Sequence, residues 1–145
     1  SIRDAIVIPY EQIPHFPRTT VPGHEGKLLI GELEGVPVIG LKGRKHYYEV
    51  AYEPFNTGIL QAVFAVHVLA DMGVKNYFAT NEVIVARNRG MRTVGMSCIT
   101  NVITEDGTNA TNHEEVKAIL ESPKVKERLS STVRNFFKLY REQYM

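Results

Sequence analysis

The segment VPVIGLKGRKHYYE, Val36–Glu49, decides the fold class of this chain. Its first part, Val36–Leu41, is a β-rich run that predicts a strand. The strand is followed at once by a loop dense in polar and aromatic side chains, Gly43–Glu49. In open α/β sheets, ligands collect at the carboxyl ends of the strands. We therefore expect an α/β fold in which this loop lies at the end of a strand, where a binding site would form.

The sequence on either side of this segment alternates between strand and helix patterns. Glu34-Gly35 separates Lys27–Leu33 from the Val36 strand by two residues, which predicts a hairpin. Ala5–Tyr10 predicts a short buried strand, and a proline-rich loop follows it. On the other side, apolar residues at helical spacing predict a helix over Thr57–Met72, which Gly73 would end.

The second half of the chain continues the alternation. Predicted elements are a strand at Asn76–Thr80, a helix at Glu82–Asn88 stopped by Gly90, a strand at Thr93–Thr100, a helix from the capping box Thr111–Glu114 to Leu120, and a helix restarting at Ser122-Pro123. The last helix carries an apolar stripe and should pack on a partner. Together these elements predict a mixed sheet flanked by helices, in one domain of residues 1–145.

Composition excludes several kinds of partner. The chain has 145 residues and 17 basic against 16 acidic side chains, so its net charge is +1. No strong field favours nucleic acid or anionic lipid. The longest apolar run, Ile59–Met72, is too short and too polar to span a bilayer. The one cysteine, Cys98, lies in an apolar run and is interpreted as a buried core thiol. We expect a cytoplasmic protein that binds neither nucleic acid nor membrane.

The loop after the Val36 strand carries the first candidate site. The planar guanidinium of Arg44 matches the oxygens of phosphate or carboxylate. His46 can donate a hydrogen bond beside it, and Glu49 could orient either side chain. On spacing alone, a solvated loop with an Arg–Glu pair is the commoner interpretation of such a pattern.

Three further polar residues are candidates, each with a simpler alternative. His24 lies between two glycines and could approach a ligand closely, although most such histidines are surface loop residues. Asn101 follows a predicted strand and could recognise the edge of a heterocycle or cap a turn. His113 lies at a helix start, where it could meet a ligand hydroxyl or face water.

In order along the chain, these segments resemble the trimeric purine nucleoside phosphorylases. Ile13–Leu28 is similar to the family's proline-rich loop, and Gly43–Glu49 to its phosphate-binding motif. Glu82–Arg87, Ser97–Asn101 and Asn112–Val116 are similar to its C-terminal third. The resemblance covers nearly the whole chain and implies a phosphorylase-like fold and a homotrimer.

The resemblance also implies an activity, namely cleavage of the N-glycosidic bond of a purine nucleoside with phosphate as nucleophile. It implies no metal and no organic cofactor, because inorganic phosphate is the co-substrate. By this resemblance, Arg44 and His46 would bind phosphate, and His24 would lie near it. Tyr48 would contact the ribose, and His113 would bind the ribose 5′-hydroxyl. Asn101 would hydrogen-bond the N7 and O6 edge of the purine. Asn101, His113 and His46 would carry catalysis, and Asn101 favours 6-oxopurines such as those of inosine and guanosine.

The sequence departs from the family pattern in two places. The family has a Gly/Ser-rich phosphate loop at a position preceding residue 1. It also has a long central region after the position of Asn81, whereas here Glu82 follows directly. The 81/82 junction predicts segments that were omitted or excised from a longer polypeptide, and a chain that is short by nature or design is the alternative.

Two other functions stay open at this point. A short chain could be a remnant without catalysis, which binds phosphate or nucleoside or associates with itself. A methylthioadenosine phosphorylase of the same superfamily is the second, although its ribose pocket is apolar where this chain has His113.

Overall fold

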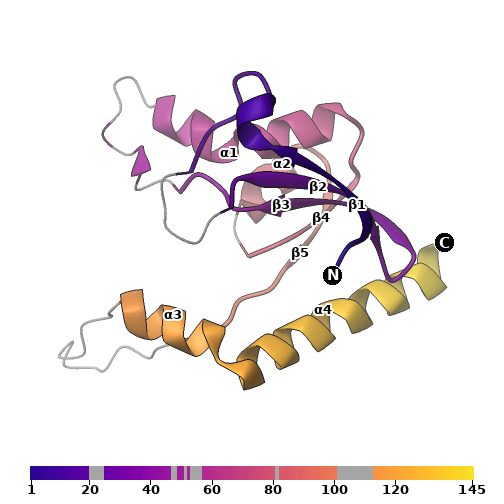
Figure 1. Cartoon of the computed structure of the whole chain (residues 1–145). Helices are drawn as coiled ribbons and strands as arrows, with labels where there is room; N and C mark the ends of the chain where they lie inside the picture. Colours follow the sequence, from indigo (N-terminus) through magenta and orange to yellow (C-terminus); the bar gives the residue numbers. More distant parts are fainter. Residues whose placement is uncertain (20–24, 47–48, 51, 53–56, 81, 101–112) are drawn as a thin grey trace. The chain divides into compact units, whose positions relative to one another are not determined.

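The computed structural model describes residues 1–19, 25–46, 49–50, 52, 57–80, 82–100 and 113–145. The elements, in chain order, are β1 (Arg3–Pro9), η1 (Tyr10–Gln12), β2 (Lys27–Leu33), β3 (Val36–Lys42), α1 (Thr57–Asp71), β4 (Asn76–Ala79), α2 (Val83–Asn88), β5 (Arg92–Gly95), α3 (His113–Glu121) and α4 (Pro123–Tyr144) (Figure 1). They form two compact units, one of Ser1–Glu32 with Pro37–Met96 and one of Leu33–Val36 with Ser97–Met145. The single domain and the 81/82 junction stay predictions, and Asn81 lies outside the described residues.

The first sheet has the strand order β1-β2-β3. β1 pairs with β2 in antiparallel register, from Ile6 opposite Ile30 to Pro9 opposite Lys27. Glu34 and Gly35 join β2 to β3, with φ angles of 52° and 81°. Positive φ at both central residues is the geometry of a tight hairpin turn that matches the twist of its strands. The predicted hairpin is confirmed.

The prediction that the first strand is buried is wrong. β1 is confirmed as a strand, but the side chain of Ile6 is 63% exposed and Val7 is also exposed. β1 is an edge of its sheet, so in the described part of the chain it pairs only with β2. An apolar run alone does not distinguish an edge strand from a central one.

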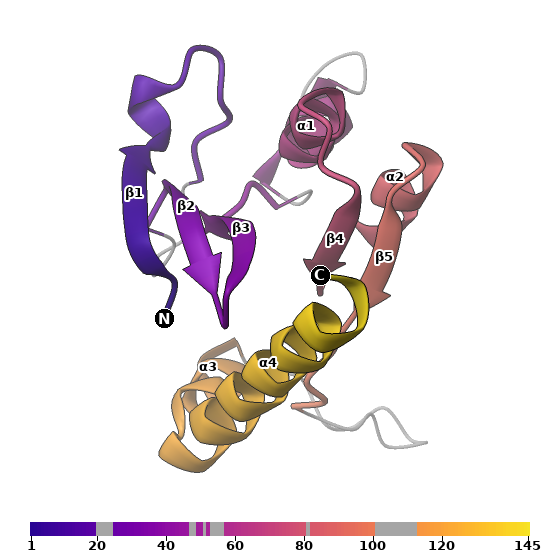
Figure 2. The same ribbon diagram turned by 90° about the vertical axis from the view of Figure 1, so that its right-hand side faces the viewer.

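The second sheet consists of β4 and β5, which run side by side in the same direction (Figure 2). The register runs from Asn76 opposite Arg92 to Ala79 opposite Gly95, and α2 is the crossover between the two strands. The predicted strand to Thr100 is therefore too long, because β4 has only four residues to pair with. The last bond of the ladder is donated by the Met96 amide to the Ala79 carbonyl, at 3.0 Å. Cys98 lies beyond this strand and is half-buried, not fully buried as predicted.

Parallel and antiparallel pairing thus both occur, and helices accompany the strands, which confirms the predicted α/β class. A buried cluster in the first unit is built from α1, α2 and the residue just before β5. Its members are Val66, Leu69, Ala86 and Met91. Ile39 and Leu41 of β3 pack against this cluster, so the strand that leads to the candidate loop is anchored on the same core.

α1 ends as the sequence predicts. Gly73 has a φ of 89°, in the left-handed region where glycine carries no steric cost. Its amide donates to the Ala70 carbonyl, and the Val74 amide donates to the Leu69 carbonyl, each at 3.0 Å. This pair of bonds is the Schellman arrangement, which satisfies carbonyls that the helix leaves unpaired.

The second unit contains α3 and α4. Pro123 begins α4 after Ser122, whose backbone is extended, as predicted. Thr111 and Asn112 of the predicted capping box lie outside the described residues. The predicted apolar stripe of α4 is half-buried from Val125 to Tyr140, whereas Tyr144 at its end is exposed, and no described residue of α4 is fully buried. Within this unit Arg141 donates a hydrogen bond of 3.1 Å to the carbonyl of Glu34.

No helix in the described ranges is both long enough and apolar enough to cross a bilayer.

Replacing Gly58 by alanine should destabilise the first unit. A Cβ at this position would lie 2.0 Å from the carbonyl oxygen of Val50, a buried residue. Since backbone cannot yield as a flexible side chain does, we expect a loss of about 1–3 kcal/mol in the free energy of unfolding. Urea unfolding followed by circular dichroism measures it.

Gly95→Ala is the matched control. Its Cβ would lie 3.7 Å from a methyl group of Val83, which is an ordinary contact. Equal stability of the two variants would contradict the close approach of α1 to Val50.

Candidate functional site

The candidate loop begins at Gly43, where β3 ends, and a hydrogen bond from Tyr10 holds Gly43 in place. The Tyr10 hydroxyl donates a 2.7 Å hydrogen bond to the carbonyl of Gly43, and the Tyr10 amide donates to the Gly26 carbonyl at 2.8 Å. Gly43 has a φ of 105°, which only glycine adopts readily, so the chain turns sharply out of the strand here. Tyr10 is 2% exposed, and burial raises its pKa to about 12. The neutral hydroxyl is thus kept as a donor.

Aromatic side chains connect this point to the proline-rich loop and to α1. The rings of Tyr10 and Phe16 lie 4.2 Å apart between centroids. The ring of Phe16 meets that of Phe64 on α1 edge to face, at 5.9 Å. Edge-to-face and offset contacts of this kind add to the stabilisation from burial. The loop before β2, the end of β3 and α1 are therefore held together beside the candidate residues.

Glu49 makes two contacts within the candidate loop and so stabilises its conformation. Its carboxylate accepts a 2.6 Å hydrogen bond from the His46 amide and lies 3.3 Å from the ammonium of Lys45. The side chains of Lys45 and Glu49 are only 12% and 4% exposed, so this ion pair is largely shielded from water. The sequence suggested that Glu49 orients Arg44 or His46, and the structure shows that it holds His46 through the backbone.

Arg44 forms an ion pair with Glu82, a partner that sequence reasoning missed. Nη1 of Arg44 donates to Oε1 of Glu82, and the two side chains are 30% and 15% exposed. Tyr77 lies close to the pair. Its pKa is raised to about 12 by burial first and by the negative charge of Glu82 second, while Arg44 opposes the rise. The partners are 38 residues apart in the sequence, so spacing carries no signal of this contact.

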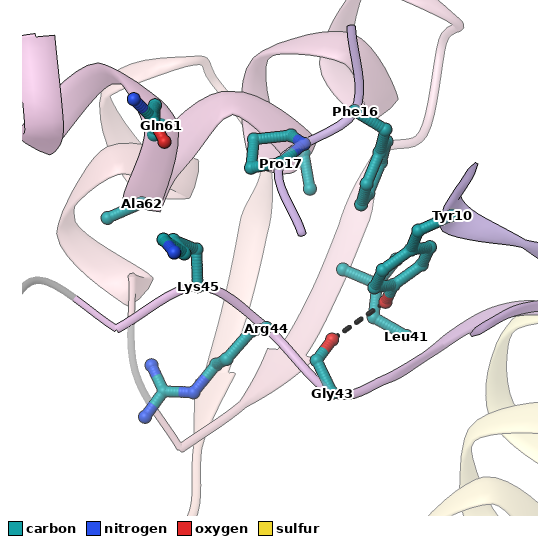
Figure 3. A pocket seen from close by; sticks show the side chains of 10 residues that line it. Tyr10, Phe16, Pro17, Leu41, Gly43, Arg44, Lys45, Gln61 and Ala62 are labelled. Atoms are coloured by element: carbon teal, nitrogen blue, oxygen red, sulfur yellow. Dashed lines mark hydrogen bonds between the residues drawn. The ribbon is translucent and has the colours of Figure 1, made fainter. Parts of the chain in front are cut away.

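A small hollow lies beside Arg44 and Lys45 (Figure 3). It holds about 250 Å³, including space open to solvent. Its walls are Tyr10, Phe16, Pro17, Leu41, Gly43, Gln61, Ala62 and Ala65. The Arg44 side chain points away from the aromatic pair of Tyr10 and Phe16 (Figure 3). Arg44 and Lys45 are the charged residues of the lining of the hollow, and the others are uncharged.

Of the predicted site residues, Arg44 and His46 are described and lie on the same turn after β3. His24, Tyr48 and Asn101 lie outside the described residues. His113 is the first residue of α3, but its side chain also lies outside them. In the part of the chain that the structure describes, no three acidic, histidine or cysteine side chains are grouped to hold a metal ion.

Comparison with known proteins yields consistent matches. The chain is 42% identical over 81 residues to purine nucleoside phosphorylase 1 of Geobacillus stearothermophilus, and 37% identical over 109 residues to that of Bacillus subtilis. These matches cover 56% and 75% of this chain.

Over these stretches the chain is similar to purine nucleoside phosphorylases.

The chain spans only 27% and 38% of the length of these two phosphorylases. No protein-family model matches it. Among solved structures, the purine nucleoside phosphorylase of Schistosoma mansoni in complex with inosine is 36% identical, with a TM-score of 0.44 over 55% of this chain and 26% of that one.

The Tyr10 hydroxyl should titrate late, and its ionisation should weaken the fold. Its pKa is about 12 in the folded chain against the ordinary value of 10.0. Since the unfolded chain loses this proton first, stability is full below pH 10 and is lost as the pH rises toward 12. Absorbance at 295 nm, compared between the chain and Tyr10→Phe, should show a missing component centred near pH 12. Tyr77, whose pKa shifts in the same direction, remains in both proteins.

A missing component centred near pH 10 would contradict the burial of this hydroxyl. Tyr10→Phe should also lower the free energy of unfolding by about 1 kcal/mol, the usual contribution of one internal hydrogen bond.

Proposed function

We propose that this chain carries the phosphate-binding part of a purine nucleoside phosphorylase. The reaction would cleave the N-glycosidic bond of a purine nucleoside with inorganic phosphate and release the free purine and ribose 1-phosphate. The observation that supports this most is the position of Arg44 and His46 on one glycine-initiated turn at the carboxyl end of β3, in a chain similar to these phosphorylases.

The residues of the turn suit phosphate in charge and shape. A guanidinium offers parallel donors that match two phosphate oxygens. The bond from the His46 amide to the Glu49 carboxylate fixes the backbone of the turn before the ligand arrives. Phosphate held here would be positioned to attack the anomeric carbon of the ribose, in a transition state that resembles an oxocarbenium ion, as in glycoside hydrolysis.

The remaining roles rest on the resemblance to the phosphorylases, and the role of Asn101 also suits the chemistry of the leaving group. Negative charge develops on the purine as the bond breaks, and Asn101 would bind that charge more strongly than the neutral base. His113 would hold the ribose 5′-hydroxyl, Tyr48 would contact the ribose and His24 would lie near phosphate. Inorganic phosphate is the co-substrate in this proposal, without a metal or an organic cofactor. A homotrimer and a cytoplasmic location stay predictions.

Arg44→Ala should nearly abolish phosphate-dependent cleavage of inosine. Loss of a bidentate, charge-assisted contact to a bound anion costs on the order of 3 kcal/mol, or more than a hundredfold in kcat/KM for phosphate. The release of hypoxanthine from inosine, measured over a range of phosphate concentrations, tests it.

Arg89→Ala is the matched control, because Arg89 is also paired with a carboxylate, that of Asp71. It should retain the activity. Equal turnover by the Arg44 variant and the unaltered chain would refute the phosphate role.

The nucleoside preference provides a separate test. With Asn101 at the base and His113 at the ribose, inosine and guanosine should be cleaved at least about tenfold faster than adenosine or methylthioadenosine, since a site built to hydrogen-bond a group rejects analogues that lack it. Preference for methylthioadenosine would favour a methylthioadenosine phosphorylase activity. Phosphate binding without cleavage of any nucleoside would favour the non-catalytic alternative.

A further inference from the structure

The ion pair between Arg44 and Glu82 places a negative charge where the proposed function needs a phosphate. Carboxylate and phosphate oxygens are equivalent acceptors for a guanidinium, and both prefer the same planar, charge-assisted geometry. Glu82 therefore occupies Arg44 with a group that imitates the ligand. The contact joins the end of β3 to the residue before α2, two places far apart in the sequence.

The side chain of Glu82 is mostly buried, and its backbone has an uncommon conformation. Its side chain is only 15% exposed, and its backbone lies in the left-handed region with φ 55° and ψ 11°. This region is uncommon for residues other than glycine, asparagine and aspartate. A non-glycine residue is held there only when its surroundings fix it. The pair with Arg44 is one contact that Glu82 makes.

An anion that approaches Arg44 consequently meets two unfavourable effects. The guanidinium charge is already neutralised by Glu82, and two anions on one cation repel each other. Phosphate must either displace the carboxylate or bind beside it. Since the pair is partly shielded from water, neither effect is screened as it would be on an open surface.

We propose that Glu82 competes with phosphate for Arg44 and thereby sets the affinity of this chain for phosphate. The inference rests on the proposed function, because it requires Arg44 to be a phosphate ligand. Glu82 is thus an affinity-determining residue for the co-substrate, and removal of its charge strengthens binding where removal of an ordinary structural ion pair would weaken it or leave it unchanged.

Calorimetry with inorganic phosphate on the 145-residue chain tests the proposal. Glu82→Gln should lower the dissociation constant for phosphate by about three- to tenfold, which corresponds to the strength of a partly exposed ion pair. Asp71→Asn is the matched control, because it removes a carboxylate from the Arg89 pair and changes the net charge equally. It should leave the dissociation constant unchanged.

Glu82→Asn is a second variant, which can still test the proposal if Glu82→Gln does not fold. Asparagine tolerates the left-handed backbone better than glutamine does and also lacks the charge. Circular dichroism confirms that each variant is folded. Tighter binding by a folded Glu82 variant supports the proposal, and unchanged or weaker binding overturns it.

Arg44→Ala separates this inference from the proposed function. If that substitution abolishes phosphate binding while the Glu82 variants do not strengthen it, the competition is wrong and Arg44 remains the phosphate ligand. If it leaves phosphate binding unchanged, both fail. The double variant Arg44→Ala with Glu82→Gln should show no gain over Arg44→Ala alone, since the carboxylate acts only through the guanidinium.

Discussion

The hydroxyl of Tyr10 donates a hydrogen bond to the carbonyl of Gly43, and the geometry of the candidate site depends on this contact. It connects the end of β1 to the end of β3, which are separated by 33 positions. Gly43 can then turn away from the strand with a φ of 105°, so that Arg44 begins a new direction beside the hollow. The bond is partly buried, and a neutral donor and a carbonyl interact more strongly there than in water.

Two carboxylates contact this turn and have different effects on it. Glu49 is almost completely buried and fixes the backbone of the turn through His46. Glu82 contacts the guanidinium of Arg44 and sets how readily that cation accepts another anion. One negative charge thus shapes the loop while the other opposes its proposed ligand. The affinity for phosphate in this account is a difference between the attraction to Arg44 and the repulsion from Glu82, and not a property of Arg44 alone.

Much of the fold could be predicted from local patterns. The Glu34-Gly35 hairpin, the end of α1 at Gly73 and the start of α4 at Pro123 depend on backbone preferences that the sequence states directly. The exposure of β1 and the early end of β5 could not be predicted, because both depend on which strands lie beside them. The same limit applies to the site. Arg44 and His46 can be chosen as candidates from their position after a strand, whereas the contacts of Glu82 and Tyr10 with the candidate loop depend on the tertiary structure.

Chemical-shift mapping tests the central claim, that phosphate binds at the turn after β3, more directly than any other measurement. In ¹⁵N-labelled chain titrated with inorganic phosphate, the amides of Gly43, Arg44, Lys45 and His46 should shift together and saturate, while those of α3 and α4 stay in place. Shifts confined to α3 and α4, or no shift in the turn at phosphate concentrations that saturate binding, would contradict the account.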